Sequence, residues 1–184
     1  MLKTDGGTVW LTGLPAAGKS TIAETVQLLF REQGLEVFHL DGDELRSGLN
    51  ADLAFTASGR AENVRRLGEV ALLLGGFGHL ALVSAISPYR ADRAKVRNRH
   101  KMTKTAFIEV YVTTPLEVCE ARDPKGHYAR ARRGEIQTFT GVSAPYEAPN
   151  CPDVRLDTMG SPIQSAIDLF DAIIGARLVK EFGS

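Results

Sequence analysis

A glycine-rich run directly after a short apolar segment constrains this chain more than any other feature of its sequence. Residues 13–20 fit the pattern G-x-x-x-x-G-K-[ST] at every fixed position, and residues 8–12 before them have the apolar character of a strand. Glycines at these positions let the backbone curl so that successive N–H groups point at phosphate oxygens. Apolar residues at helical spacing follow from Ser20 onward, which places the positive end of a helix dipole under the loop. The context predicts a phosphate-binding loop rather than a glycine-rich turn with a surface lysine.

The last two residues of this loop motif, Lys19 and Ser20, carry polar side chains. Lys19 is expected to reach the β and γ phosphates of a nucleotide, and the Ser20 hydroxyl is expected to hold a Mg²⁺ ion that bridges them. Anion binding by backbone, cation and helix dipole together is therefore the first function that the sequence predicts.

Length, charge and apolar content exclude several classes of protein. The 184 residues suit one domain, because domains commonly have about 100–200 residues. Lys plus Arg equals Asp plus Glu at 22 each, which argues against the strongly basic charge of a nucleic-acid-binding protein. No signal peptide opens the chain, and its apolar runs are far shorter than the roughly 20 residues that span a bilayer. We expect no nucleic-acid partner, no membrane partner and a cytoplasmic location. The scattered cysteines and histidines show no metal-ligand spacing, so buried or surface roles are expected for them.

Apolar runs and helical patterns alternate along the chain, which predicts a parallel sheet. Gly34 ends the first helix and a second strand follows at 35–40, and crossovers of this kind are right-handed in nearly all proteins. Three further strands are expected at 79–86, 106–112 and 154–157, with a helix before each. The sum is an α/β fold with a five-stranded parallel sheet and helices on both faces.

Local signals mark several of these helices. Residues 114–117 form a capping box with proline at the first helical position, and residues 161–164 form a second one. The very basic segment 91–104 is expected to be a helix that faces solvent. The closing helix is expected to bury an apolar face made of Ile163, Ala166, Ile167, Phe170, Ile173 and Ile174.

Acidic and hydroxyl side chains follow the predicted strands at their carboxyl ends. Asp41 and Asp43 come directly after the second strand, and Ser87 follows the third. Parallel strands bring these ends to the edge of the sheet that carries the phosphate loop. A plain Asp-Gly hairpin turn is the alternative at 41–43, but residues 44–49 do not alternate as a returning strand would.

A polar cluster opens the long helix before the third strand. Guanidinium groups pair bidentately with phosphate or sulfate oxygens, so such a cluster suits a second anionic ligand. Spacing alone leaves this interpretation and a solvated helix face equally open. The cluster consists of Arg60, Glu62, Asn63, Arg65 and Arg66.

Residues 122–141 are the least regular long segment of the chain. The segment is basic, and glycines at 126, 134 and 141 could serve as hinges. Long basic segments beside a nucleotide often act as lids that exclude water, and a mobile surface loop is the alternative. We expect a lid here within one domain of residues 1–180, and set the polar tail 181–184 aside as a remnant of cloning.

Together these motifs resemble the adenylylsulfate kinase family, and the resemblance covers nearly the whole chain. Members of this family phosphorylate the 3′-hydroxyl of adenosine 5′-phosphosulfate with ATP. The resemblance therefore implies a single-domain P-loop kinase that makes 3′-phosphoadenylylsulfate and ADP in sulfate assimilation. The motifs that carry it are the phosphate loop, Asp41-Gly42-Asp43 with Arg46, Gly48-Leu49-Asn50, Phe55 with Arg60, Glu62, Asn63 and Arg65-Arg66, residues 86–93, residues 117–126, and Phe139-Thr140-Gly141 before residues 145–149.

The resemblance also implies catalytic and ATP-binding roles. Lys19 would act on the phosphates, Asp43 would orient or deprotonate the acceptor hydroxyl, and Asp41 would help to order magnesium and water. Ser87 is the family's traditional phosphoserine position, but the sequence places no histidine or lysine base beside it, so we expect a positioning role. The implied ATP-binding residues are Gly13, Leu14, Pro15, Ala16, Ala17, Gly18, Lys19, Ser20 and Thr21.

An acceptor site is implied in the same way. Phe55 and Phe139 would sandwich the adenine of the sulfated nucleotide, arginines would hold its phosphosulfate, and Lys125 would belong to the lid. The implied substrate-binding residues are Asp43, Arg46, Phe55, Arg60, Asn63, Ile86, Ser87, Lys125 and Phe139.

Three positions depart from the family pattern. Ala54 stands where a glycine usually precedes the stacking phenylalanine, and Ala85 stands where a large aromatic is usual. Gly59 replaces an aspartate and so removes a carboxylate beside Arg60. We therefore expect Arg60 to be ordered by the ligand, and Gly59→Asp to tighten adenylylsulfate binding modestly.

Two other classes of function stay open at this level. One is a related P-loop kinase for another small hydroxyl acceptor, and the pair Phe55 and Phe139 discriminates, because a sugar acceptor would have no use for two stacking rings. A nucleotide-dependent switch would carry a guanine-reading N-K-x-D sequence, which is absent here, and a regulatory domain could have lost Asp43, which is present. The resemblance further implies Mg²⁺ with ATP, a homodimer, and sulfate adenylyltransferase as a fused or functional partner.

Overall fold

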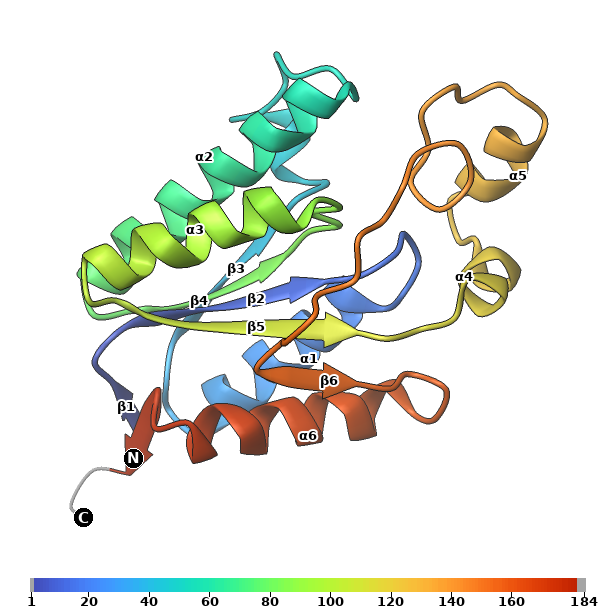
Figure 1. Ribbon diagram of the computed structural model, residues 1–184. Helices are drawn as coiled ribbons and strands as arrows, with labels where there is room; N and C mark the ends of the chain where they lie inside the picture. Colours follow the sequence, from blue (N-terminus) through green and yellow to red (C-terminus); the bar gives the residue numbers. More distant parts are fainter. Residues whose placement is uncertain (1, 182–184) are drawn as a thin grey trace.

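A parallel sheet forms the centre of this computed structural model, which describes residues 2–181 (Figure 1). Its strands, in spatial order, are β3 (Val37–Asp41), β4 (Leu80–Ser84), β2 (Gly7–Thr12), β5 (Ala106–Val112) and β6 (Val154–Leu156). The middle strand β2 is buried along its whole length, as expected for a nearly continuous apolar run covered on both faces. The predicted five-stranded parallel sheet is therefore confirmed.

Helices cover both faces of the sheet. α1 and α6 lie on one face, and α2 and α3 lie on the other (Figure 1). Side chains of β2 alternate between the two sides, so Val9 and Leu11 join the core beside α1, whereas Trp10 joins the core beside α2. The helical elements are α1 (Lys19–Glu32), the 3₁₀ turn η1 (Leu45–Ser47), α2 (Ala57–Gly76), α3 (Arg90–Met102), α4 (Leu116–Arg122), α5 (His127–Arg132) and α6 (Pro162–Gly175).

The strands of the parallel sheet end at one edge, and the connections that follow them gather there. The loop from β2 into α1, the turn η1 after β3 and the short helices α4 and α5 after β5 all lie at this edge (Figure 1). The hairpin alternative at 41–43 is wrong, because η1 and α2 follow β3 in place of a returning strand.

A second, smaller sheet lies at the opposite end of the molecule and was not predicted. β1 (Leu2–Thr4) pairs antiparallel with β7 (Val179–Glu181), and Leu2 is the partner of Glu181. Glu181 is thus part of the fold although the tail from 181 was set aside, and residues 182–184 lie outside the described residues. Within the described range 2–181, no helix is both long enough and apolar enough to cross a bilayer.

The expectation that the basic segment 91–104 faces solvent is wrong for one side of α3. Arg93 and His100 are buried at 3% and 0% exposure. Arg93 forms an ion pair of 2.8 Å with Glu109 on β5, and the His100 ring lies 2.9 Å from the Thr8 hydroxyl. A charged side chain can be buried when a partner satisfies it, and such a partner is not visible in the helix's own sequence.

Two predicted helix starts differ in their details. Thr114 does not cap α4, because its hydroxyl donates to the Ala17 carbonyl (2.8 Å) and Pro115 is the residue before the helix. Ser161 does cap α6, accepting from the Ile163 N–H at 3.2 Å.

The packed face of α6 also differs from the prediction. Ala166, Leu169 and Ile173 are buried, whereas Ile163 and Ile167 are 63% and 38% exposed. This helix is apolar over most of its circumference, so contact with α1 rather than the sequence pattern selects the face that packs.

Candidate active site

The loop between β2 and α1 has the strained geometry of an anion-binding turn. Gly18 has φ 97° and Ala16 has φ 58°, which is a left-handed conformation that alanine rarely adopts. A Cβ on Gly13 would stand 2.8 Å from the Val112 carbonyl oxygen, so only glycine fits there. The first helical residue, Lys19, follows directly. The predicted phosphate loop is therefore placed as expected, with Thr21 exposed in the first turn of α1.

The Lys19 side chain folds back over this loop. Its ammonium group donates to the carbonyl oxygens of Gly13 (3.1 Å) and Leu14 (2.7 Å) and is 8% exposed. Burial lowers the pKa of Lys19 to about 8, although the negative charge of Asp43 opposes this shift. Because the hydrogen-bond partners of this buried ammonium group are neutral carbonyls, its positive charge is available to bind an anion such as phosphate.

Ser20 and Asp41 form a polar network beside the loop. Asp41 Oδ2 accepts from the hydroxyls of Ser20 (2.5 Å) and Ser84 (2.8 Å). Its Oδ1 accepts from the N–H groups of Asp43 (2.7 Å) and Glu44 (3.2 Å). Burial favours a higher pKa for Asp41, but these four hydrogen bonds outweigh it and the pKa lies below its usual value. Asp41 is therefore a fixed carboxylate next to the hydroxyl of the phosphate loop.

Ser84 has a further neighbour that fixes a histidine tautomer. Its hydroxyl proton is used on Asp41, so the 2.9 Å contact with His39 Nε2 requires that nitrogen to be the donor.

Asp43 reaches across the edge of the sheet to the predicted lid. Its Oδ2 accepts from the ammonium group of Lys125 at 2.6 Å, and both side chains are exposed. This hydrogen bond is the main cause of the raised pKa of Lys125. The structure thus joins two predicted site residues that lie 82 positions apart in the chain.

Arg46 and Phe55 form a second pair on the same side. The Arg46 guanidinium lies over the Phe55 ring at 4.2 Å from its centroid, and its Nη1 donates to the Leu53 carbonyl. Burial, followed by the nearby charge of Arg60, lowers the pKa of Arg46. The ring of Phe55 is 61% exposed, and an exposed aromatic ring beside a cation is suited to stacking on a base.

Arg60 is held by the protein itself. Its Nε donates to the Phe55 carbonyl (3.0 Å), its Nη2 to the Thr138 carbonyl (2.5 Å), and its Nη1 to the Thr140 hydroxyl. The expectation that a ligand must order Arg60 is therefore wrong. Arg60 instead ties the Phe55 loop to the segment that carries Phe139.

Gly59 also differs from expectation. A Cβ on this residue would lie 2.0 Å from the Ala54 carbonyl oxygen, so the local backbone excludes a side chain. The prediction that Gly59→Asp tightens ligand binding does not fit this geometry.

Phe139 is half-buried and packs against α5. Its ring contacts Tyr128 edge-on at 4.9 Å and His127 at 6.1 Å between centroids. Phe55 and Phe139 thus contact different partners, and Arg60 connects their backbones.

Asn63 and Ile86 are placed near these groups through hydrogen bonds. Asn63 is buried and accepts from Asn50 at 3.0 Å, and the Asn50 side-chain oxygen has no hydrogen-bond partner in the described part of the chain. The Ile86 carbonyl accepts from the Thr12 hydroxyl at 2.7 Å.

Ser87 is buried at 3% exposure and has a left-handed φ of 40°. Its oxygen accepts from the Trp10 indole N–H at 3.0 Å, and its proton is directed at the Ala85 carbonyl at 3.3 Å. This partner of Trp10 was not predicted, because an apolar strand pattern does not show which side chain carries a useful donor.

Arg93 was also missed as a site-supporting residue. It donates to the carbonyls of Ser87 (2.6 Å) and Glu147 (2.7 Å) while paired with Glu109. One guanidinium therefore fixes the segment after β4 to the segment before β6.

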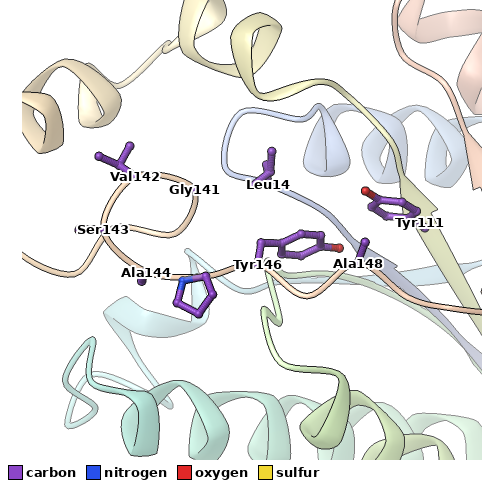
Figure 2. Close-up of a pocket in the computed structure, with 9 residues that line it drawn as sticks. Leu14, Tyr111, Gly141, Val142, Ser143, Ala144, Tyr146 and Ala148 are labelled. Atoms are coloured by element: carbon purple, nitrogen blue, oxygen red, sulfur yellow. The ribbon is translucent and has the colours of Figure 1, made fainter.

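A pocket of about 570 Å³ opens beside the phosphate loop (Figure 2). Figure 2 shows Leu14, Tyr111 and Tyr146 around it, with Gly141, Val142, Ser143 and Ala144 along one side. Leu14 is the sole predicted site residue in its lining. The pocket lies beside the predicted acceptor residues rather than among them.

In the range 2–181, no three His, Cys, Asp or Glu side chains converge where they could hold a metal ion. Cys119 is buried and Cys151 is exposed.

Comparison with known proteins decides the family. The sequence pattern of the family described as "Adenylylsulphate kinase" matches residues 5–157. The chain belongs to the adenylylsulphate kinase family. An adenylyl-sulfate kinase of Saccharomyces cerevisiae is 46% identical over 180 residues, covering 97% of this chain and 89% of the relative.

Two mycobacterial proteins give further detail on this family. A bifunctional enzyme CysN/CysC of Mycobacterium tuberculosis is 50% identical over 91% of this chain and 28% of its own length. The solved structure of the M. tuberculosis APS kinase CysC in complex with AMPPNP and APS has a TM-score of 0.90, with 50% identity, and covers 92% of this chain and 98% of that one.

Membership of this family makes nucleotide-dependent phosphoryl transfer the chemistry of the site. The geometry shows separately that two of the three departures from the family pattern are neighbours, because the Ala54 carbonyl occupies the space beside Gly59.

Proposed function

We propose that this chain transfers the γ-phosphoryl group of ATP to the 3′-hydroxyl of adenosine 5′-phosphosulfate, giving 3′-phosphoadenylylsulfate and ADP. The observation that carries the proposal is the meeting, at one sheet edge, of the Lys19 loop with the Asp43–Lys125 pair and the Arg46–Phe55 pair. The first group suits a nucleotide triphosphate, and the other two suit an anionic purine nucleotide that presents a hydroxyl. The family of the chain agrees with both assignments.

The donor half of the reaction is assigned to the phosphate loop. Lys19 would leave its two neutral carbonyl partners and donate to phosphate oxygens instead, because hydrogen bonds between opposite charges are stronger. Ser20 and Asp41 offer a hydroxyl and a carboxylate 2.5 Å apart, and hard oxygen donors of this kind fit Mg²⁺, which is commonly held by one or two carboxylates plus substrate phosphates. Bound there, Mg²⁺ would neutralise charge that develops on the phosphates.

The acceptor half is assigned to residues on three connections. Asp43, next to the fixed Asp41, would accept or orient the proton of the 3′-hydroxyl. Phe55 and Phe139 would stack on the adenine, and Arg46 would attract the phosphosulfate. Arg60, with three donors already used by protein, would act mainly by holding the two aromatic segments together.

Ser87 is assigned a positioning role. Its hydroxyl is buried between Trp10 and the Ala85 carbonyl, and no base lies within hydrogen-bond distance in the described residues. Direct in-line transfer needs alignment and charge stabilisation rather than a phosphoserine.

A coupled assay tests the function. With Mg²⁺ and ATP, adenylylsulfate should be turned over at about 1–100 per second, and Lys19→Ala should nearly abolish turnover. Asp43→Asn should lower kcat far more than it raises the KM of the acceptor. Gluconate and shikimate serve as decoy acceptors, and preference for either one, or no labelled product from adenylylsulfate, would reject the proposal.

We also propose a homodimer in the cytoplasm that works beside sulfate adenylyltransferase. Exposed Ile163 and Ile167 on α6 support an interface, since clustered apolar side chains often mark one. Free Cys119 and Cys151 are in keeping with a reducing compartment. The match within a longer bifunctional relative supports a partner enzyme.

A further inference from the structure

Tyr128 on α5 touches both halves of the proposed site although no motif singled it out. It is 2% exposed, and its hydroxyl donates to the Pro15 carbonyl of the phosphate loop at 3.1 Å. Its ring meets Phe139 edge-on, with centroids 4.9 Å apart and planes at 84°. One side chain thus contacts the phosphate loop with its polar end and the aromatic platform with its ring.

The contact with Pro15 bears on the shape of the phosphate loop. In a trans peptide the carbonyl and the following N–H point in opposite directions, so the hydrogen bond from Tyr128 also fixes where the Ala16 N–H points. Ala16 has a left-handed φ of 58°, a conformation that persists only where the surroundings enforce it. Tyr128 is one of the groups that enforce it.

Four of the loop carbonyls accept from side chains, and these four divide into two classes. Those of Gly13 and Leu14 accept from Lys19, which is expected to leave them when phosphate binds. Those of Pro15 and Ala17 accept from Tyr128 and Thr114, which a nucleotide does not compete for. We therefore expect Tyr128 to keep its hydrogen bond when a nucleotide binds.

The contact with Phe139 bears on the acceptor. An edge-on aromatic pair is worth about 0.5–1.5 kcal/mol beyond its buried area, so the Tyr128 ring helps to set the angle of the Phe139 ring. Arg60 holds the residues on either side of Phe139 and reaches back to the Phe55 carbonyl. The Phe139 ring is thereby held by Tyr128, while Arg60 holds the residues before and after it to the Phe55 backbone.

We propose that Tyr128 is a positioning residue that sets the phosphate loop through its hydroxyl and the acceptor-stacking platform through its ring. This inference rests on the proposed function for the identity of the acceptor. Burial raises the pKa of Tyr128, which keeps the hydroxyl protonated and able to donate.

Two substitutions separate the two contacts. Tyr128→Phe keeps the ring and should weaken binding of a non-hydrolysable ATP analogue about three- to tenfold, as expected for one lost hydrogen bond, while binding of adenylylsulfate alone stays unchanged. Tyr128→Leu should weaken binding of both ligands. Each Kd is measured by isothermal titration calorimetry on the full chain, with a thermal melt to confirm that each variant is folded.

Thr4→Val is the control. It removes another hydroxyl that donates to a backbone carbonyl, that of Leu178 at 2.7 Å, at the end of the molecule away from the phosphate loop, so both affinities should stay within about twofold. Equal nucleotide binding by Tyr128→Phe and wild type would overturn the loop role, and unchanged adenylylsulfate binding by Tyr128→Leu would overturn the double role. A wild-type protein that binds the ATP analogue but not adenylylsulfate would reject the proposed acceptor, while the nucleotide comparison would still decide the role of Tyr128 at the loop.

Discussion

At the scale of single residues, Lys19 shows how the phosphate loop is prepared for its ligand. Burial holds its pKa at about 8, far below the usual value for lysine. A bound phosphate stabilises the charged form and raises that pKa. The bound protein therefore holds more protons than the free protein above pH 8, and nucleotide affinity must fall as pH rises through this range.

This linkage gives a quantitative prediction. Proton uptake on binding a non-hydrolysable ATP analogue should be close to zero near pH 6.5 and approach roughly one proton per site near pH 9. Calorimetry in buffers of different ionisation enthalpy measures the uptake. The pH-dependent part should disappear in Lys19→Met, and an uptake that does not change with pH in the wild type would contradict the assignment.

Gly59 gives a second prediction at this scale. Because an added Cβ would lie 2.0 Å from a backbone oxygen, Gly59→Ala should destabilise the fold by about 1–3 kcal/mol, as overpacked sites do. It should also raise the KM of the acceptor, since Ala54 precedes Phe55. Gly76→Ala is the control, because that glycine ends the same helix and has no atoms within 4 Å of its ideal Cβ. Urea denaturation of the two variants compares them, and equal stabilities would refute the steric argument.

At the scale of elements, the segment 122–141 is the part of the site that we propose to move. Tyr128 holds the middle of this segment at the phosphate loop, and Arg60 holds its end at Thr138 and Thr140. Near its start, Lys125 is linked to Asp43 by an exposed ion pair, and pairs of this kind contribute only about 0.2–1 kcal/mol. The part around Lys125 can therefore open without a large cost, which a lid requires.

Lys125→Met tests this link. The change should lower kcat/KM for adenylylsulfate and reduce its dependence on salt, because one screened charge near the acceptor is lost, while the KM of ATP stays nearly the same. Lys95→Met removes another exposed lysine, one that pairs within α3 with Asp92, and should leave both parameters unchanged. If the two variants behaved alike in steady-state kinetics over a salt series, Lys125 would have no special role in the lid.

At the scale of the whole molecule, features encoded by neighbouring residues were the ones that the sequence made predictable. The phosphate loop and the strand and helix beside it are local patterns, and the family resemblance reached the whole chain. Contacts between distant residues were not predictable in this way. The Tyr128 hydroxyl donates to the Pro15 carbonyl, which is 113 positions away in the chain, and Arg60 donates to the Thr140 hydroxyl, which is 80 positions away. The packed face of α6 escaped prediction for a related reason, because a helix with a wide apolar surface does not mark which part of that surface packs.

The small sheet of β1 and β7 has a consequence for how this chain can be joined to others. Leu2 and Glu181 are paired, so the two ends of the described chain are neighbours, at the end of the molecule away from the phosphate loop (Figure 1). The path of the chain therefore returns almost to its starting point, with one small gap between the two ends. A second protein attached at either end would leave from the same place, at the end of the molecule opposite the site. A short peptide could also bridge the gap, so that the chain could be cut open at a surface loop elsewhere with its order of contacts intact.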